Sequence, residues 1–96
     1  MTKLEKLYLN CLRTTADAYR YGTFDRRGAI AFMAGCIESR LRQQAELDGL
    51  DVNVPTTPPQ LALPQPLSAT DLLLQELYAE AITFYIARIG RLRLAN

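Results

Sequence analysis

The sequence predicts an all-α fold, a three-helix bundle in which an antiparallel helical hairpin packs against a long C-terminal helix. Residues 2–21 and 25–48 each repeat apolar residues at helical spacing and are each followed by a glycine. Residues 69–94 are apolar over more than half of a helix circumference. All five prolines lie within residues 50–67, which excludes a helix there. The 96 residues are expected to form one domain.

Residues 2–21 form the first predicted helix. Thr2 and Glu5 have the spacing of a capping box, in which the hydroxyl and the carboxylate each bind a free backbone N–H group. Gly22 can adopt the left-handed conformation that ends a helix. The apolar face is expected to comprise Leu4, Leu7, Tyr8, Cys11, Leu12, Thr15, Ala18 and Tyr19.

Residues 25–48 form the second predicted helix, which Thr23 or Asp25 caps and Gly49 ends. Because its connection to the first helix is short, the two helices are expected to form an antiparallel hairpin. The main apolar face is expected to comprise Ile30, Met33, Ala34, Ile37 and Leu41.

Small residues recur on another flank of the second helix, at Ala31, Gly35 and Ser39, with Phe32 and Cys36 beside them. Small side chains at this spacing let another backbone approach closely. The favoured interpretation is that the third helix or the proline-rich segment packs there. The alternative is a dimer interface, with Ala31, Phe32 and Gly35 as candidate self-association residues.

Two cysteines are level with each other in the predicted hairpin, at Cys11 and Cys36. They are expected to face each other. In a reducing cytoplasm they are expected to remain thiols, as buried cysteines commonly do. A disulfide is the alternative, and it requires the two Cα atoms to lie within about 7 Å.

Residues 50–67 combine the prolines with valines and leucines, which makes the segment too apolar for a free linker. The favoured interpretation is a strap that runs back along the hairpin and buries its alternate apolar residues. The alternative is a docking segment for a partner's aromatic groove, because residues 55–58 fit the P-x-x-P pattern.

Residues 69–94 form the third predicted helix, with Ser68 as its cap and Asp71 as the reciprocating acid. Arg88 falls within the apolar face, where burial of its aliphatic stem is favoured over pairing with a carboxylate. The broad apolar face is expected to comprise Leu74, Leu77, Tyr78, Ala81, Phe84, Tyr85, Ile89 and Leu92.

A second, narrower apolar stripe on the third helix comprises Leu72, Ala79 and Ile86. The hairpin covers only one side of this helix, so the stripe requires cover from the strap or from a second copy of the chain. These three residues are therefore further candidate self-association residues.

The composition argues against catalytic and metal chemistry. The chain has no histidine, and two cysteines do not make a zinc site without other ligands. It has no phosphate-binding loop, dinucleotide-binding motif or nucleophile elbow. We therefore expect no catalytic residue, no metal, no cofactor and no enzymatic activity.

Net charge and hydropathy limit the partners and the cellular location that we expect for this protein. The net charge of +1 argues against a dedicated nucleic-acid binder, which is normally basic. No apolar run approaches the roughly 20 residues of a membrane span, and the N-terminal residues lack a signal-peptide core. A cytoplasmic protein without membrane contact is expected.

The tip of the hairpin is the candidate partner-binding site. Arg26 and Arg27 begin the second helix, where the helix dipole disfavours positive charge, and Tyr and Arg are enriched at binding hot spots. The favoured alternative is structural: Tyr19 and Phe24 close the core, and the arginines are solvated or pair with Asp17 and Asp25. The candidate residues are Tyr19, Arg20, Tyr21, Phe24, Arg26 and Arg27.

The function these observations favour is a non-enzymatic protein-interaction module: a small adaptor, inhibitor or accessory subunit. Its partner is another protein, with a homodimer as one form. The alternative is a nucleic-acid-binding accessory protein that uses the arginine and aromatic residues of the tip. An enzyme or ligand carrier with a pocket under the strap ranks last, because no polar residues converge there in the sequence.

Overall fold

A computed structural model describes residues 2–49 and 58–94, with side chains for residues 2–49 and 58–89. Three helices are present in this part of the chain: α1 (Lys3–Arg20), α2 (Arg26–Leu47) and α3 (Ala69–Leu94). Every pair of helices is in contact. The predicted all-α three-helix bundle is therefore confirmed.

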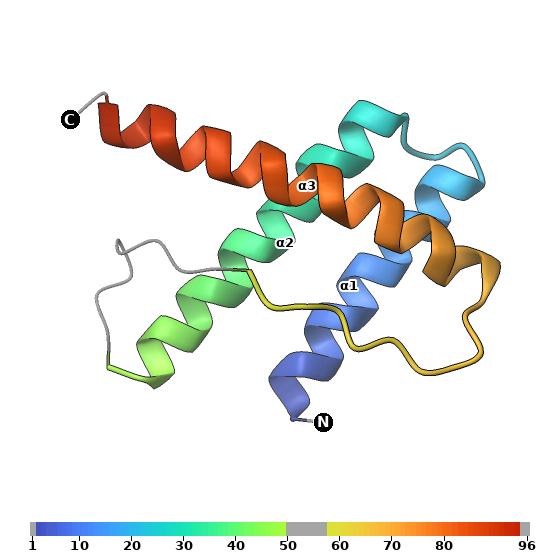
Figure 1. Cartoon of the computed structure of the whole chain (residues 1–96), viewed down its shortest axis with the longest axis horizontal. Helices are drawn as coiled ribbons and strands as arrows, with labels where there is room; N and C mark the ends of the chain where they lie inside the picture. The colour runs from blue at the N-terminus through green and yellow to red at the C-terminus, as the bar shows by residue number, and fades with distance from the viewer. Residues whose placement is uncertain (1, 50–57, 95–96) are drawn as a thin grey trace.

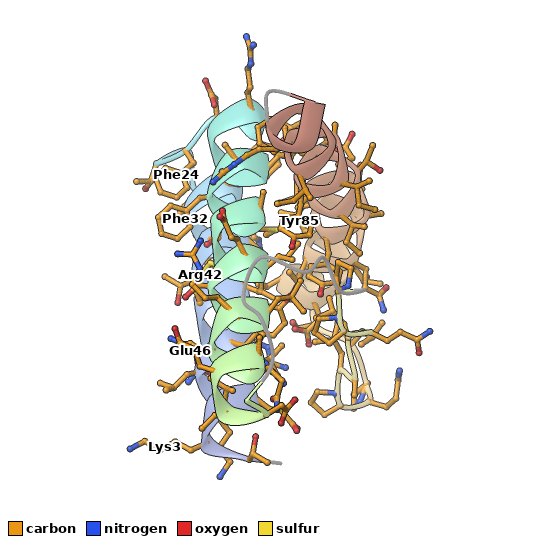
Figure 2. The ribbon with its side chains drawn as sticks, turned by 90° about the vertical axis from the view of Figure 1, so that its left-hand side faces the viewer. Lys3, Phe24, Phe32, Arg42, Glu46 and Tyr85 are labelled. Carbon is orange, nitrogen blue, oxygen red and sulfur yellow. A yellow bond between two sulfur atoms is a disulfide. The ribbon has the colours of Figure 1, made fainter. Side chains whose placement is uncertain are left out.

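The helices form two layers (Figures 1 and 2). α1 and α2 lie side by side and antiparallel, and α3 crosses one face of this hairpin. Residues 58–68 lie on the same side of the hairpin as α3 and pass over α1 before α3 begins. The molecule is flat, with Cα extents of 39 × 30 × 17 Å.

Local hydrogen bonds at the helix ends agree with the sequence. The Thr2 hydroxyl accepts the Glu5 N–H at 3.1 Å, and the Asp25 carboxylate accepts the Gly28 N–H at 2.6 Å. Gly22 and Gly49 have φ values of +84° and +69°, the left-handed conformation expected where α1 and α2 end. Helix boundaries could be predicted closely because these bonds join residues only three positions apart.

The core lies between the hairpin and α3. Its fully buried large apolar side chains come from all three helices, and Figure 2 shows Tyr85 lying between α2 and α3. Leu7 was expected in the core but is 57% exposed, and it lines a hollow between α1 and α2. The fully buried apolar side chains include Leu12, Met33, Ile37, Leu74 and Leu77.

A buried hydrogen-bond network fastens the strap to the helices. The Tyr78 hydroxyl donates to the Pro59 carbonyl at 2.7 Å, and the Tyr8 and Tyr78 hydroxyl oxygens are 2.5 Å apart. Leu61 and Leu63 pack against the core. The expectation that the strap packs on the bundle is confirmed for residues 58–67, whereas most of the P-x-x-P pattern lies outside the described residues.

Ion pairs join α3 to the hairpin near both ends of the helix. Asp71 is buried and pairs with Arg13 at 3.1 Å. Its carboxylate also accepts the Ser68 N–H, and the Ser68 hydroxyl accepts the Asp71 N–H, which confirms the expected cap. Arg88 pairs with Glu38 at 2.5 Å. We expected burial of the aliphatic stem of Arg88 rather than an ion pair. This expectation was wrong, because α2 presents the Glu38 carboxylate at this position.

We predict that Tyr78→Phe lowers the free energy of unfolding by about 1–3 kcal/mol, because the Pro59 carbonyl and the Tyr8 hydroxyl both lose their partner. Tyr8→Phe is the matched control, since it keeps the Tyr78–Pro59 bond and should cost less. Urea unfolding monitored by circular dichroism measures both. An equal loss in the two variants would contradict the anchoring role of Tyr78.

We also predict a pH-dependent loss of stability in Asp71→Asn. Burial by itself raises the pKa of Asp71, but hydrogen bonds from Arg13 and Ser68 lower it overall. A carboxyl group whose pKa is lower in the folded chain than in the unfolded chain stabilises the fold. The full contribution is present at pH values above the unfolded-state pKa, and it disappears as the pH falls through the folded-state pKa. Wild type should therefore melt above Asp71→Asn at pH 7, with the difference shrinking below about pH 4. A constant difference down to acidic pH would contradict this origin.

Candidate functional site

The hairpin tip is a tight turn that directs two side chains outward. The N–H groups of Thr23 and Phe24 both donate to the Ala18 carbonyl, at 2.7 and 3.1 Å. Tyr21 is 73% exposed, and the Arg20 guanidinium lies 5.3 Å from the centre of its ring. The tip therefore exposes Tyr21 to solvent, with the Arg20 guanidinium against its ring.

Arg26 is partly exposed and is held against α3 by two carboxylates. Its guanidinium pairs with Glu80 at 2.6 Å and with Glu76 at 3.2 Å. The neighbouring Tyr19 hydroxyl and then Glu76 raise the pKa of Arg26. The charge that the helix dipole disfavours is thus compensated by another helix rather than by the expected Asp17 or Asp25.

The other tip residues divide between structural and exposed positions. Arg20 donates to the Thr70 hydroxyl at 3.2 Å, and that hydroxyl donates to Asp17 at 2.6 Å, so both residues fasten the start of α3. Tyr19 is partly buried against the core, whereas Arg27 is exposed. Among the described tip residues, Tyr21 and Arg27 are the ones most available to a partner.

An apolar surface extends from the tip along the hairpin. We call it the hairpin face. The Phe24 and Phe32 rings lie 5.6 Å apart, and Phe32 is 52% exposed. Figure 2 shows both rings on the side of the hairpin away from α3. Leu7 lies farther along α1 and lines a hollow of about 170 Å³ between α1 and α2.

The small residues of α2 belong to this exposed surface. Ala31 is exposed, and a Cβ atom added at Gly35 would meet no described atom within 4 Å. The expectation that α3 or the described strap packs on this flank was wrong. α3 instead covers the opposite flank of α2, where Ala34 and Ile37 are buried.

Cys11 and Cys36 join the two helices at the hollow of the hairpin face. They face each other as expected, with Cα atoms 6.9 Å apart, and they form a disulfide. The expectation of free thiols was wrong, since the two backbones approach closely enough for a bond. Closing a loop of 25 residues stabilises a fold by roughly 3 kcal/mol in the chain-entropy account.

The described residues do not cover the second apolar stripe of α3. Leu72 and Ile86 are 57% and 58% exposed, and Ala79 between them is exposed. The described part of the strap packs at Tyr78 on another side of α3. The flat molecule thus has an apolar strip on the outer surface of each layer.

Sequence reasoning missed one polar cluster, formed by Tyr8, Tyr78 and Arg40 beneath the strap. Arg40 lies one turn after Cys36 on the flank of α2 that faces α1, and its guanidinium is 6.0 Å from the centre of the Tyr8 ring. Its position one turn from a residue that faces the first helix was the only signal in the sequence. The rest of the cluster comes from α1 and α3.

Three further comparisons concern metal binding, membrane spans and known proteins. Within residues 2–49 and 58–89, no three potential metal-ligating side chains are grouped together. No helix in the described part is long and apolar enough to cross a membrane. No protein-family model, curated protein or solved structure gives a significant match to the chain.

We predict that Arg26→Gln lowers the melting temperature by a few degrees, because α2 loses its pairs with Glu76 and Glu80. Arg27→Gln removes the same charge from the neighbouring exposed position and should leave the melting temperature unchanged. Thermal unfolding at low and high salt compares them. A larger loss in Arg27→Gln would contradict the assignment of Arg26 as the structural arginine.

Proposed function

We propose that this protein is a non-enzymatic interaction module, a small accessory subunit that associates through the hairpin face with a second copy of itself. The observation that carries the proposal is the exposure of Leu7 and Phe32 on the outer surface of a molecule only 17 Å thick. Soluble monomers rarely expose contiguous apolar patches larger than a few hundred Å², and larger patches commonly mark an interface.

The shape of the hairpin face supports a second copy as the occupant. Phe32 projects from it, and the hollow of about 170 Å³ begins at Cys36, one turn farther along the same helix. In a two-fold dimer each surface meets itself, so the Phe32 of one copy can enter the hollow of the other. Leu4, Leu7 and Ser39 line the hollow together with Arg40, which is the one charged residue of its lining.

The nucleic-acid alternative has less support. It relied on three arginines at the tip, and Arg26 is neutralised by Glu76 and Glu80. Arg20 is engaged with Thr70 and Tyr21. A single remaining exposed arginine, Arg27, provides little of the phosphate attraction on which nucleic-acid affinity depends.

We predict that Phe32→Ser raises the dimer dissociation constant by about tenfold or more, because a central aromatic anchor carries much of an interface's affinity. Sedimentation equilibrium over micromolar concentrations measures this change. Ile86→Ser is the matched control: Ile86 is similarly exposed, at 58% against 52% for Phe32, but lies on α3, so its loss should leave the dimer intact.

Three outcomes would overturn the assignment of the hairpin face. A wild-type chain that stays monomeric at high micromolar concentration would exclude the second copy as partner. Dissociation by Ile86→Ser but not by Phe32→Ser would place the interface on α3. A melting temperature that collapses in Phe32→Ser would show that Phe32 supports the fold through Phe24 rather than the association.

A further inference from the structure

The disulfide between Cys11 and Cys36 is the main tie between α1 and α2 away from the tip. Among residues 2–49, no hydrogen bond or ion pair joins a residue of α1 directly to a residue of α2, because their polar side chains bond within one helix or to α3. The other contacts between the two helices are packing contacts, such as that of the Arg40 guanidinium with the Tyr8 ring. The disulfide therefore fixes the spacing of the hairpin where the turn no longer does.

The hollow of the hairpin face lies between the disulfide and the open end of the hairpin (Figure 1). Both cysteines line it, and its other lining residues precede Cys11 on α1 or follow Cys36 on α2. The two helices thus provide opposite walls, and the width of the hollow depends on the spacing that the disulfide fixes. These lining residues are Leu4, Leu7 and Tyr8 on α1 and Ser39, Arg40 and Gln43 on α2.

The same hollow makes the disulfide reachable from solvent. Cys11 is half-buried, whereas Cys36 is 9% exposed. Thiol–disulfide exchange requires a thiolate to reach one of the two sulfurs, and exposed disulfides are the ones that exchange readily. A small thiol that enters the hollow therefore meets Cys11 first.

We propose that the Cys11–Cys36 disulfide is an exchange site for a small dithiol, and that its reduction weakens association through the hairpin face. The second effect rests on the proposed function. A thiolate of the dithiol attacks Cys11 Sγ, the S–S bond breaks, and Cys36 leaves as a thiolate that takes up a proton. The second thiol of the reagent then attacks its own sulfur in the mixed disulfide and releases Cys11. The protein disulfide gains two electrons, the dithiol becomes a cyclic disulfide, and its two protons end on the two cysteine thiols.

Reduction alters the hollow but leaves the core in place. Two separate thiols need more room than a bonded pair of sulfurs, so α1 and α2 change their spacing at the wall that receives Phe32 of the second copy. α3 still holds both helices, because Asp71 pairs with Arg13 on α1 and Arg88 pairs with Glu38 on α2. The reduced chain is therefore folded but presents a surface that fits a second copy less well.

The exchange site is tested by reducing the folded full-length chain with dithiothreitol, with new thiols alkylated at intervals and counted by mass spectrometry. We expect a rate proportional to the dithiothreitol concentration and unchanged by urea below the unfolding transition. A rate that reaches a plateau with dithiothreitol, or that follows unfolding by urea, would overturn the site because exchange would then require the chain to open.

Two single variants locate the sulfur that is attacked. Cys36→Ser leaves the Cys11 thiol, and Cys11→Ser is the matched control that leaves the Cys36 thiol. Each alkylation rate with iodoacetamide is divided by the rate of the same variant in urea, which removes intrinsic differences in reactivity. This ratio should be severalfold larger for Cys11, and a ratio as small as that of Cys36 would overturn attack at Cys11.

Sedimentation equilibrium of the oxidised and reduced chains tests the effect on association. Reduction should raise the dimer dissociation constant by at least about fivefold, the lower end of the usual range for coupling between two events. The double variant Cys11→Ser, Cys36→Ser should show the reduced value with or without dithiothreitol. An unchanged dissociation constant, or a reduced chain that circular dichroism shows to be unfolded, would overturn the control of association. An oxidised chain that stays monomeric would reject the proposed function and this coupling with it, whereas the exchange site is decided by the reduction rates alone.

Discussion

The burial of one apolar face of α3 against the hairpin is the constraint on which the rest of the structure depends. α1 and α2 alone would leave Leu12, Met33 and Ile37 exposed on one side. Leu74 and Leu77 of α3 cover them, and all five side chains are completely buried. Burial of this size contributes about 1.5–3 kcal/mol for each large apolar side chain, which makes α3 indispensable to a chain this short.

Ion pairs then set where α3 crosses the hairpin. Exposed pairs add little stability, but several placed along one helix favour a single orientation over others of similar burial. They occur from the first turn of α3 to its later turns, and they link it to both α1 and α2. The pairs are Arg13–Asp71, Arg26–Glu76, Arg26–Glu80 and Arg88–Glu38.

A bundle of three helices in two layers has consequences for function. Each layer has an outer surface that no other layer covers, and here these surfaces retain Phe32 on α2 and Ile86 on α3. The strap lies over α1 beside α3, so it closes a cavity at Arg40 instead of covering the outer stripe of α3.

The sequence by itself determined the three helices, their caps and the hairpin, because periodicity, capping bonds and left-handed glycines act over a few residues. It also placed Cys11 level with Cys36. Only the tertiary structure decided which flank of α2 meets α3, which carboxylates bind Arg26 and Arg88, and that a polar cluster gathers around Arg40. The ion pairs between the hairpin and α3 join residues 50 or more positions apart, and no local pattern specifies a pairing over that distance.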